Sequence, residues 1–498
     1  MIRIDFEGID AFSELGRMVD SFDADLSDEE TVIHAQVRRS DQSVTGVICL
    51  VEGSTRYDCE VKILRDSTQD AEMGKSNKTL GRRALLLALY RLLARRTGRT
   101  LPYGILFGVR PGKLVHQRLK QNKSALAPDI AGELVANYAM RQDRADLLVE
   151  VAQHERSIVP DLYDLSSEVS LYVGIPFCPT HCSYCTFPAY SMRDKARYAV
   201  DFMQALIHEI RAVGESLQTA HIGVTTVYVG GGTPTSLSAL ELERLLAALR
   251  DELPGHGAWR EFSVEAGRAD TITPDRVKVM KAVGVNRVSV NPQTFRDATL
   301  KKVGRGHSAS IIDKRFALFR EAGFQNINMD LIMGLPGESL DDARNSLART
   351  LALSPDSVTV HTLSYKRGAE VKKSLEVSDE PDASTVEAML DLAERELRGD
   401  GYHPYYLYRQ KDILAGRENI GYARLGKEGL YNMAIIEEVQ TIVALGGGGA
   451  SKWVDPQTGQ IMRSANAREP SAYVAHLDHI IADKRERIAA LAKKIRLK

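Results

Sequence analysis

The sequence between Glu168 and about Lys366 repeats one pattern: a short run rich in β-branched residues, a turn, and an amphipathic helical stretch. Six runs have the composition of strands: SLYVGIP, TTVYVGG, EFSVEAG, NRVSVNP, INMDLIMG and SVTVHTL. Helical periodicity follows in residues 194–218, 237–252, 274–283, 311–321 and 340–351. Alternating strands and helices form a parallel sheet with right-handed crossovers. The pattern therefore predicts an α/β fold, a partial (β/α)6 barrel whose open side leaves room for a large substrate.

The segments that flank the repeat differ from it. Residues 1–165 contain alternating runs such as TVIHAQV and YDCEVKIL, which predict a small α+β domain. Within it, residues 78–99 predict a helix whose arginines flank a leucine stripe. These arginines form either a solvated face of the helix or a docking surface for a carboxylate-rich ligand. We expect three domains: an N-terminal domain (1–165), the barrel (166–370), and a mainly helical C-terminal domain (371–498) that closes over the barrel.

Composition excludes several classes of protein. The 498 residues carry 65 Lys and Arg against 66 Asp and Glu, so charge gives no bias towards nucleic acid or an anionic membrane. No stretch approaches the roughly 20 apolar residues of a membrane span, and the opening MIRIDFEGIDAF does not resemble a signal peptide. We therefore expect a cytoplasmic protein. Cys49 and Cys59 lie in strand-like runs, where a small buried residue is the simplest interpretation.

The other three cysteines, Cys178, Cys182 and Cys185, follow the first barrel strand in GIPFCPTHCSYCTFPAY. Three thiolates spaced as CxxxCxxC can each bind one iron of a 4Fe-4S cluster and leave the fourth iron without a protein ligand. That iron can chelate the amino and carboxylate groups of S-adenosylmethionine (SAM), the source of a 5′-deoxyadenosyl radical. The alternative is a structural zinc site with His181 as a ligand, but zinc sites normally pair two short ligand units and the sequence offers no second one.

Polar and glycine residues occur where the other barrel strands end. Gly231, Gly232 and Thr233 lie in GGGTPT after the second strand, where glycines let the backbone approach a ligand. Glu265 ends the third strand, and the later positions are Gln293, Arg305 and Asp330. Each residue alone would be an ordinary turn or a satisfied polar group. Their shared place at the carboxyl ends of strands predicts a ring of SAM contacts.

Over about its last two thirds, the chain resembles the radical SAM oxygen-independent coproporphyrinogen III oxidase family. The resemblance rests, in chain order, on YVGIPFCPTHCSYC, GGGTPT, Glu265, GVNRVSVNPQTF, KVGRGH and MDLIMGLPGE. Within this family, the chain is similar to the coproporphyrinogen dehydrogenase branch, which has an extra N-terminal domain. The segments that indicate this branch are LPYGILFGVRPGK, YYLYRQKDILAGRENIGYA and ALGGGGASK. The resemblance implies that Tyr172, as a catalytic residue, contacts SAM near the cluster. It implies further SAM contacts, to one or two molecules, by Gly231, Gly232, Thr233, Glu265, Gln293, Arg305 and Asp330.

The resemblance also implies a reaction. Hydrogen is abstracted from the β-carbon of a propionate, and loss of carbon dioxide and one electron leaves a vinyl group, so that coproporphyrinogen III becomes protoporphyrinogen IX in anaerobic heme biosynthesis. A flavodoxin- or ferredoxin-type protein would donate electrons. Propionates need cationic partners. The candidates are Arg110, Lys113, Arg409 and Arg417, all in segments with the composition of loops, where an exposed solvated charge is the ordinary interpretation.

The resemblance departs at one point. The oxidases usually carry a further cysteine two residues after the third, whereas Cys185 is followed by Thr186 and Phe187, an ending similar to that of the heme chaperone branch. Three hypotheses therefore stay open: a decarboxylase, a heme-binding chaperone, and another radical SAM enzyme that opens or alkylates a tetrapyrrole. The N-terminal domain and the segment YYLYRQKDILAGRENIGYA favour the first hypothesis, and the absent cysteine favours the other two.

Overall fold

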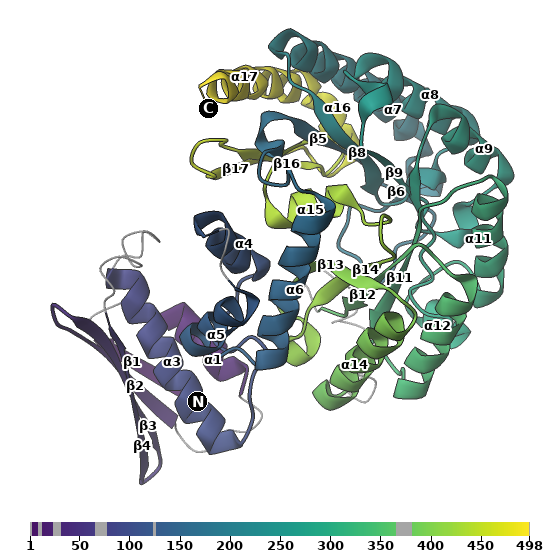
Figure 1. The fold of residues 1–498 in the computed structure, drawn as a ribbon. Helices are drawn as coiled ribbons and strands as arrows, with labels where there is room; N and C mark the ends of the chain where they lie inside the picture. Colours follow the sequence, from purple (N-terminus) through teal and green to yellow (C-terminus); the bar gives the residue numbers. More distant parts are fainter. Residues whose placement is uncertain are drawn as a thin grey trace. The chain divides into compact units, whose positions relative to one another are not determined.

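The computed structural model describes residues 2–7, 12–22, 31–64, 77–122, 126–364 and 381–497. The chain divides into two compact units, Met1–Val149 and Glu150–Lys498 (Figure 1). Of the domain boundaries expected from the sequence, the one between residues 370 and 371 lies outside the described residues. The one between residues 165 and 166 stays a prediction.

The first unit contains a sheet of strand order β1-β2-β3-β4. Strand β1 (Ile2–Glu7) is parallel to β2 (Thr31–Arg39), whereas β3 (Ser43–Glu52) and β4 (Thr55–Leu64) continue the sheet antiparallel. Helices α1 (Phe12–Asp20) and α3 (Asn77–Thr97) share the apolar core of this sheet. Further helices are α4 (Gly112–Gln121), α5 (Ala127–Tyr138) and α6 (Gln142–Ile158), which runs across the division between the units. The α+β prediction is confirmed.

Details of the first unit match the sequence interpretation in most places. Cys49 and Cys59 are buried in β3 and β4 as expected. On α3, Arg96 pairs with Glu52 at 3.2 Å, and Arg91 and Arg95 are exposed. The expected loop after α3 extends to Pro111, where α4 begins, so the interpretation of Lys113 as a loop residue was wrong.

The second unit contains all six predicted strands. They are β5 (Val169–Ile175), β8 (Val224–Gly231), β9 (Glu261–Glu265), β10 (Arg287–Ser289), β11 (Ile327–Met333) and β12 (Ser357–Thr362), each parallel to the next. The predicted helices are α7 (Met192–Ala220), α8 (Ala239–Glu252), α9 (Pro274–Val283), α11 (Ile312–Glu321) and α12 (Leu340–Leu353). Figure 1 shows them along the outer side of the strands. The partial (β/α)6 barrel is confirmed.

Local signals explain where these helices begin and end. Ser238 and Ser339 each form a capping box, in which the serine hydroxyl accepts from the backbone N–H three residues on and a carboxylate there reaches back. Helix α9 has Thr273 as its N-cap and Pro274 in its first turn, and Gly284 with φ +92° as its C-cap. These caps set where each helix begins or ends. They therefore help to fix the turns between strands and helices, and with them the positions of the last residues of the strands.

The C-terminal segment adds strands that the sequence analysis did not predict. Strands β14 (Asn419–Ala423) and β13 (His403–Tyr408) extend the sheet antiparallel beyond β12. On the other edge β15 (Thr441–Gly446) lies parallel to β5, followed by β16 (Ala450–Val454) and β17 (Ile461–Ala465). The described helices of this segment are α14 (Ala383–Gly399), α15 (Leu430–Glu437), α16 (Pro470–Ala475) and α17 (Leu477–Arg496). The described part of this segment contains more helical than strand residues, in line with the prediction, and its strands extend the barrel sheet.

No helix in the described ranges has the length and apolar character that crossing a bilayer requires.

A buried ionic network joins the C-terminal segment to the barrel. Glu209 on α7 is fully buried and pairs with Lys484 of α17, which is 2% exposed. The Glu209 carboxylate also accepts from the backbone N–H of Gly446 at 2.8 Å and from the Tyr473 hydroxyl at 2.7 Å. Lys484 donates to Asn466 Oδ1 at 2.9 Å. Removing one charge would leave the other buried without its partner, which is costly.

Glu209→Ala should therefore lower the free energy of unfolding of the second unit by about 3–5 kcal/mol. The measurement is urea denaturation of the cluster-free protein. The matched control is Glu215→Ala on the same helix, because Glu215 pairs with Arg485 of α17 where the two side chains are 59% and 54% exposed. That exposed pair should contribute under about 1 kcal/mol. Equal effects of the two substitutions would contradict the role given to the network.

Candidate cluster and cofactor site

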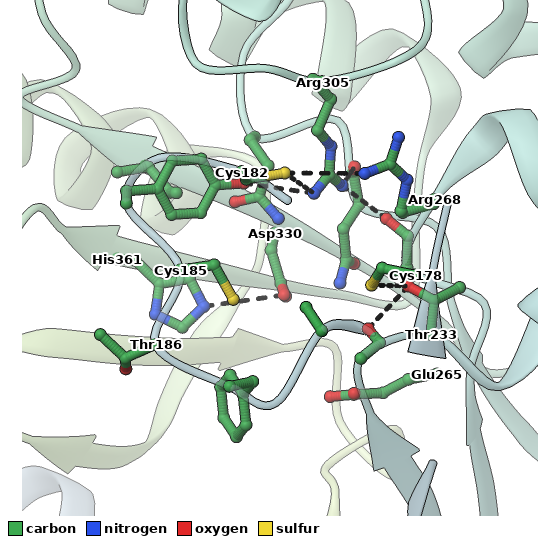
Figure 2. A pocket seen from close by; sticks show the side chains of 18 of the residues that line it. Cys178, Cys182, Cys185, Thr186, Thr233, Glu265, Arg268, Arg305, Asp330 and His361 are labelled. Carbon is green, nitrogen blue, oxygen red and sulfur yellow. Dashed lines mark hydrogen bonds and ion pairs between the residues drawn. The ribbon is translucent and has the colours of Figure 1, made fainter. Parts of the chain in front are cut away.

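A cavity lies at the carboxyl ends of the barrel strands, where the predicted site residues converge (Figure 2). The cavity is open to solvent at its mouth and has a volume of about 220 Å³. The predicted residues on its wall are Cys178, Cys182, Cys185, Gly231, Gly232, Thr233, Glu265, Gln293, Arg305 and Asp330. The structure thus brings together every residue predicted to bind the cluster or SAM except Tyr172.

The cysteine loop is held by backbone contacts at several points. Strand β6 (Phe177–Cys178) pairs with β7 (Tyr190–Ser191), which closes the base of the loop. Within it, the N–H of Cys185 donates to Cys182 O at 2.9 Å, and the N–H of Ser183 donates to Val303 O at 3.0 Å. Cys178 and Cys182 are buried and Cys185 is partly exposed, whereas His181 is exposed and is not on the cavity wall. The loop therefore presents three thiols to one space, without the histidine of the zinc alternative.

The glycine run packs directly on the cysteine loop. Gly231 has φ +110°, a conformation that L side chains rarely adopt. A Cβ on Gly232 would lie 2.4 Å from Phe177 O, so only glycine fits there. The adjacent Thr233 hydroxyl lies 3.6 Å from Cys178 Sγ, which donates to it. The close approach of these two segments explains why consecutive glycines occur at this strand end.

Two arginines flank Cys182, of which Arg268 is buried and Arg305 is partly buried. Arg268 Nη1 lies 3.7 Å and Arg305 Nη1 3.9 Å from Cys182 Sγ (Figure 2). Nearby positive charge favours a thiolate, the form of cysteine that binds metals. The pKa of the Cys178 thiol is raised to about 11, chiefly by burial. The sequence analysis missed Arg268, which stands alone in EAGRAD without a spacing that would have distinguished it.

Two carboxylates lie elsewhere on the cavity wall. Burial raises the pKa of Glu265 to about 7, helped by the charge of Asp330 and opposed by the hydrogen bond that Tyr228 donates. Asp330 accepts from Asn328 Nδ2 at 2.6 Å. His361, which the sequence analysis did not select, has its Nε2 3.6 Å from Asp330 Oδ2.

Two buried amide oxygens on the wall have no hydrogen-bond donor among the described residues. They are Asn291 Oδ1 and Gln293 Oε1, on side chains of residues that are 7% and 8% exposed. Gln293 also has φ +67°, which is uncommon for a residue other than glycine. A buried acceptor without a partner costs about 1–3 kcal/mol. The cavity therefore has acceptors that suit a ligand with N–H or O–H donors.

Tyr172, predicted to contact SAM, is not among the residues that line the cavity. Its ring stacks with the rings of Tyr228 and Tyr431, with centroids 6.2 and 6.5 Å apart. The role of Tyr172 stays a prediction.

The cavity wall, as described, includes none of the four cations proposed as propionate partners. Arg417 is 1% exposed and pairs with Asp391 at 2.8 Å, so the expectation of an exposed loop charge was wrong. Arg409 donates to Gly416 O at 3.0 Å. Arg110 and Lys113 belong to the first unit.

Comparison with known proteins agrees with this geometry. The model of the radical SAM superfamily matches residues 172–349. The oxygen-independent coproporphyrinogen-III oxidase-like protein HemZ of Bacillus subtilis is 39% identical over 453 residues, which cover 91% of this chain and 89% of HemZ. The heme chaperone HemW of Escherichia coli is 28% identical over 309 residues, 61% of this chain and 75% of HemW. The similarity to HemZ must include most of the first unit, because it leaves out only 9% of the chain.

One solved structure has a similar fold. The coproporphyrinogen III oxidase HemN from Escherichia coli, a radical SAM enzyme, aligns with a TM-score of 0.51 at 24% identity, over 64% of this chain and 71% of HemN.

Glu265 should make stability depend on pH. A carboxyl whose pKa is raised on folding, from 4.5 to about 7, stabilises the fold below pH 4.5 and loses that contribution as the pH rises through 7. Relative to Glu265→Gln, the wild-type protein should lose roughly 2–3 kcal/mol between pH 5 and 8. Urea denaturation of both cluster-free proteins at the two pH values checks this difference. A difference that does not change with pH would show that Glu265 ionises normally.

Proposed function

This chain belongs to the radical SAM superfamily and, within it, to the oxygen-independent coproporphyrinogen III oxidase family, and we propose that it decarboxylates coproporphyrinogen III. Each of two propionates would lose a hydrogen atom to the 5′-deoxyadenosyl radical, release carbon dioxide, and pass one electron to a one-electron acceptor. The product is protoporphyrinogen IX. The observation that carries the proposal is the similarity to HemZ over 91% of the chain, first unit included. A cytoplasmic setting and a flavodoxin- or ferredoxin-type electron donor belong to the same proposal.

The cofactors of this superfamily are a 4Fe-4S cluster and SAM, and the residues present fit both. Cys178, Cys182 and Cys185 would ligate three irons, and no other cysteine is on the described cavity wall. Together the cluster and SAM supply a 5′-deoxyadenosyl radical able to abstract hydrogen. Arg268 and Arg305 would place positive charge beside Cys182 when it binds an iron.

The acceptors on the wall suit the donors of SAM, which are its ammonium group and ribose hydroxyls. Asn291 and Gln293 offer amide oxygens that have no donor among the residues that the structure describes, and Glu265 and Asp330 offer carboxylates. Gly231, Gly232 and Thr233 bring the backbone to the same space. These residues would orient one or two SAM molecules and replace the water that would otherwise solvate them.

One observation favours a second candidate, a heme chaperone. Phe187 lies on the cavity wall and is 56% exposed, where the oxidases usually have a cysteine. The missing cysteine is the feature shared with the heme chaperone branch, and an exposed aromatic ring suits the face of a bound heme. The similarity to HemW covers less of the chain than the similarity to HemZ, so decarboxylation is the first proposal.

The test is anaerobic incubation of the cluster-containing protein with SAM, dithionite and coproporphyrinogen III. We expect 5′-deoxyadenosine and vinyl products, detected by chromatography and mass spectrometry. Cys178→Ala should form neither, because the cluster loses a ligand, whereas Cys59→Ala in the first unit should form both.

Formation of 5′-deoxyadenosine by the wild-type protein without a vinyl product would exclude the decarboxylase. Stoichiometric heme binding without turnover, measured by absorbance titration, would favour the chaperone instead.

A further inference from the structure

The described cavity wall contains three side chains that can carry a positive charge: Arg268, Arg305 and His361. Arg268 is 2% exposed, and it donates to both oxygens of Asp270 and to Thr180 Oγ1 at 2.9 Å. Arg305 donates to Gly267 O at 2.5 Å and to Asn291 O at 2.7 Å. Both guanidinium groups are thus committed to acceptors within the protein and to Cys182.

His361 is held much more loosely. It lies near the end of β12, and its side chain is 27% exposed. Its Nε2 is 3.6 Å from Asp330 Oδ2, and its Nδ1 is 3.4 Å from the Tyr408 hydroxyl. Both distances exceed those of good hydrogen bonds, so neither contact satisfies the ring fully. In Figure 2 the His361–Asp330 pair lies apart from the two arginines around Cys182.

The surroundings restrict where an anionic ligand group could lie. Asp330 and Glu265 are acidic and line the wall on β11 and β9. A carboxylate that enters the cavity loses water and needs a charged or hydrogen-bonding partner. An imidazole offers an N–H donor in its neutral form and a positive charge as well when it is protonated. Of the three side chains on the described wall that can carry a positive charge, His361 is the one whose donors are not already committed to short contacts.

We propose that His361 binds a carboxylate side chain of the substrate. This inference rests on the proposed function and deepens it, because it identifies the carboxylate subsite for a tetrapyrrole propionate. Tyr408 positions the ring from Nδ1, while the carboxylate accepts from the imidazole. Arg268 and Arg305 remain beside Cys182.

The test is fluorescence titration of the cluster-containing full chain with coproporphyrin III, the oxidised tetracarboxylate, and with its tetra-amide. His361→Gln should raise the Kd for coproporphyrin III about tenfold, the effect of losing one charge-assisted contact. His361→Lys, which supplies a cationic donor at the same position, should stay within about threefold of wild type. The Kd for the tetra-amide should be the same in all variants. The matched control is His208→Gln, because His208 is exposed on α7.

An unchanged Kd for coproporphyrin III in His361→Gln would overturn the inference, as would an equal loss for both ligands, which indicates a structural role. If the wild-type protein forms vinyl product while His361→Gln binds normally, only the inference fails. If binding depends on His361 but no vinyl product forms, only the decarboxylase proposal fails. If wild type binds no coproporphyrin III, the subsite does not exist.

Discussion

Two backbone hydrogen bonds join the cysteine loop to the next strand end, and the geometry of the site depends on them. The N–H of Gly232 donates to Ile175 O at 2.7 Å, and the N–H of Thr233 donates to Phe177 O at 2.8 Å. Side chains at 231 and 232 would prevent this approach, because a Cβ there would lie 2.7 Å or less from those same carbonyls. Parallel strands make the contact possible, since their carboxyl ends meet at one edge. Three thiols and a stretch of open backbone therefore face one cavity.

Charge is distributed unevenly within this cavity. Arg268 and Arg305 surround Cys182, where thiolates need positive charge. Glu265 and Asp330 lie elsewhere on the wall, where their carboxylates would accept hydrogen bonds from the ammonium group of SAM under the proposed function. Because burial strengthens each of these interactions, a few residues suffice to orient a small ligand. Beneath Glu265, Tyr228 anchors the carboxylate and stacks with Tyr431.

Much of the barrel was predictable because its signals are local. Each strand run and each amphipathic helix is visible in a short window of sequence, and the strand ends follow from them. The place of strand β15 in the sheet was not predictable, because this strand pairs Thr441 with Val169, which is far away in the chain. Arg268 and His361 gave no signal, since a single polar residue near a strand end has many ordinary uses. The surroundings of Tyr172 could not be predicted from the sequence either, because the packing of Tyr431 against its ring is a tertiary contact.

The central claim is that three cysteines hold a 4Fe-4S cluster with one iron open to SAM. Electron paramagnetic resonance of the dithionite-reduced, reconstituted protein tests it most directly, with spectra recorded before and after SAM is added. Binding of SAM to the open iron should shift the g-values of the reduced cluster. A cluster signal that SAM leaves unchanged, or reconstituted protein that shows no cluster signal, would contradict the account.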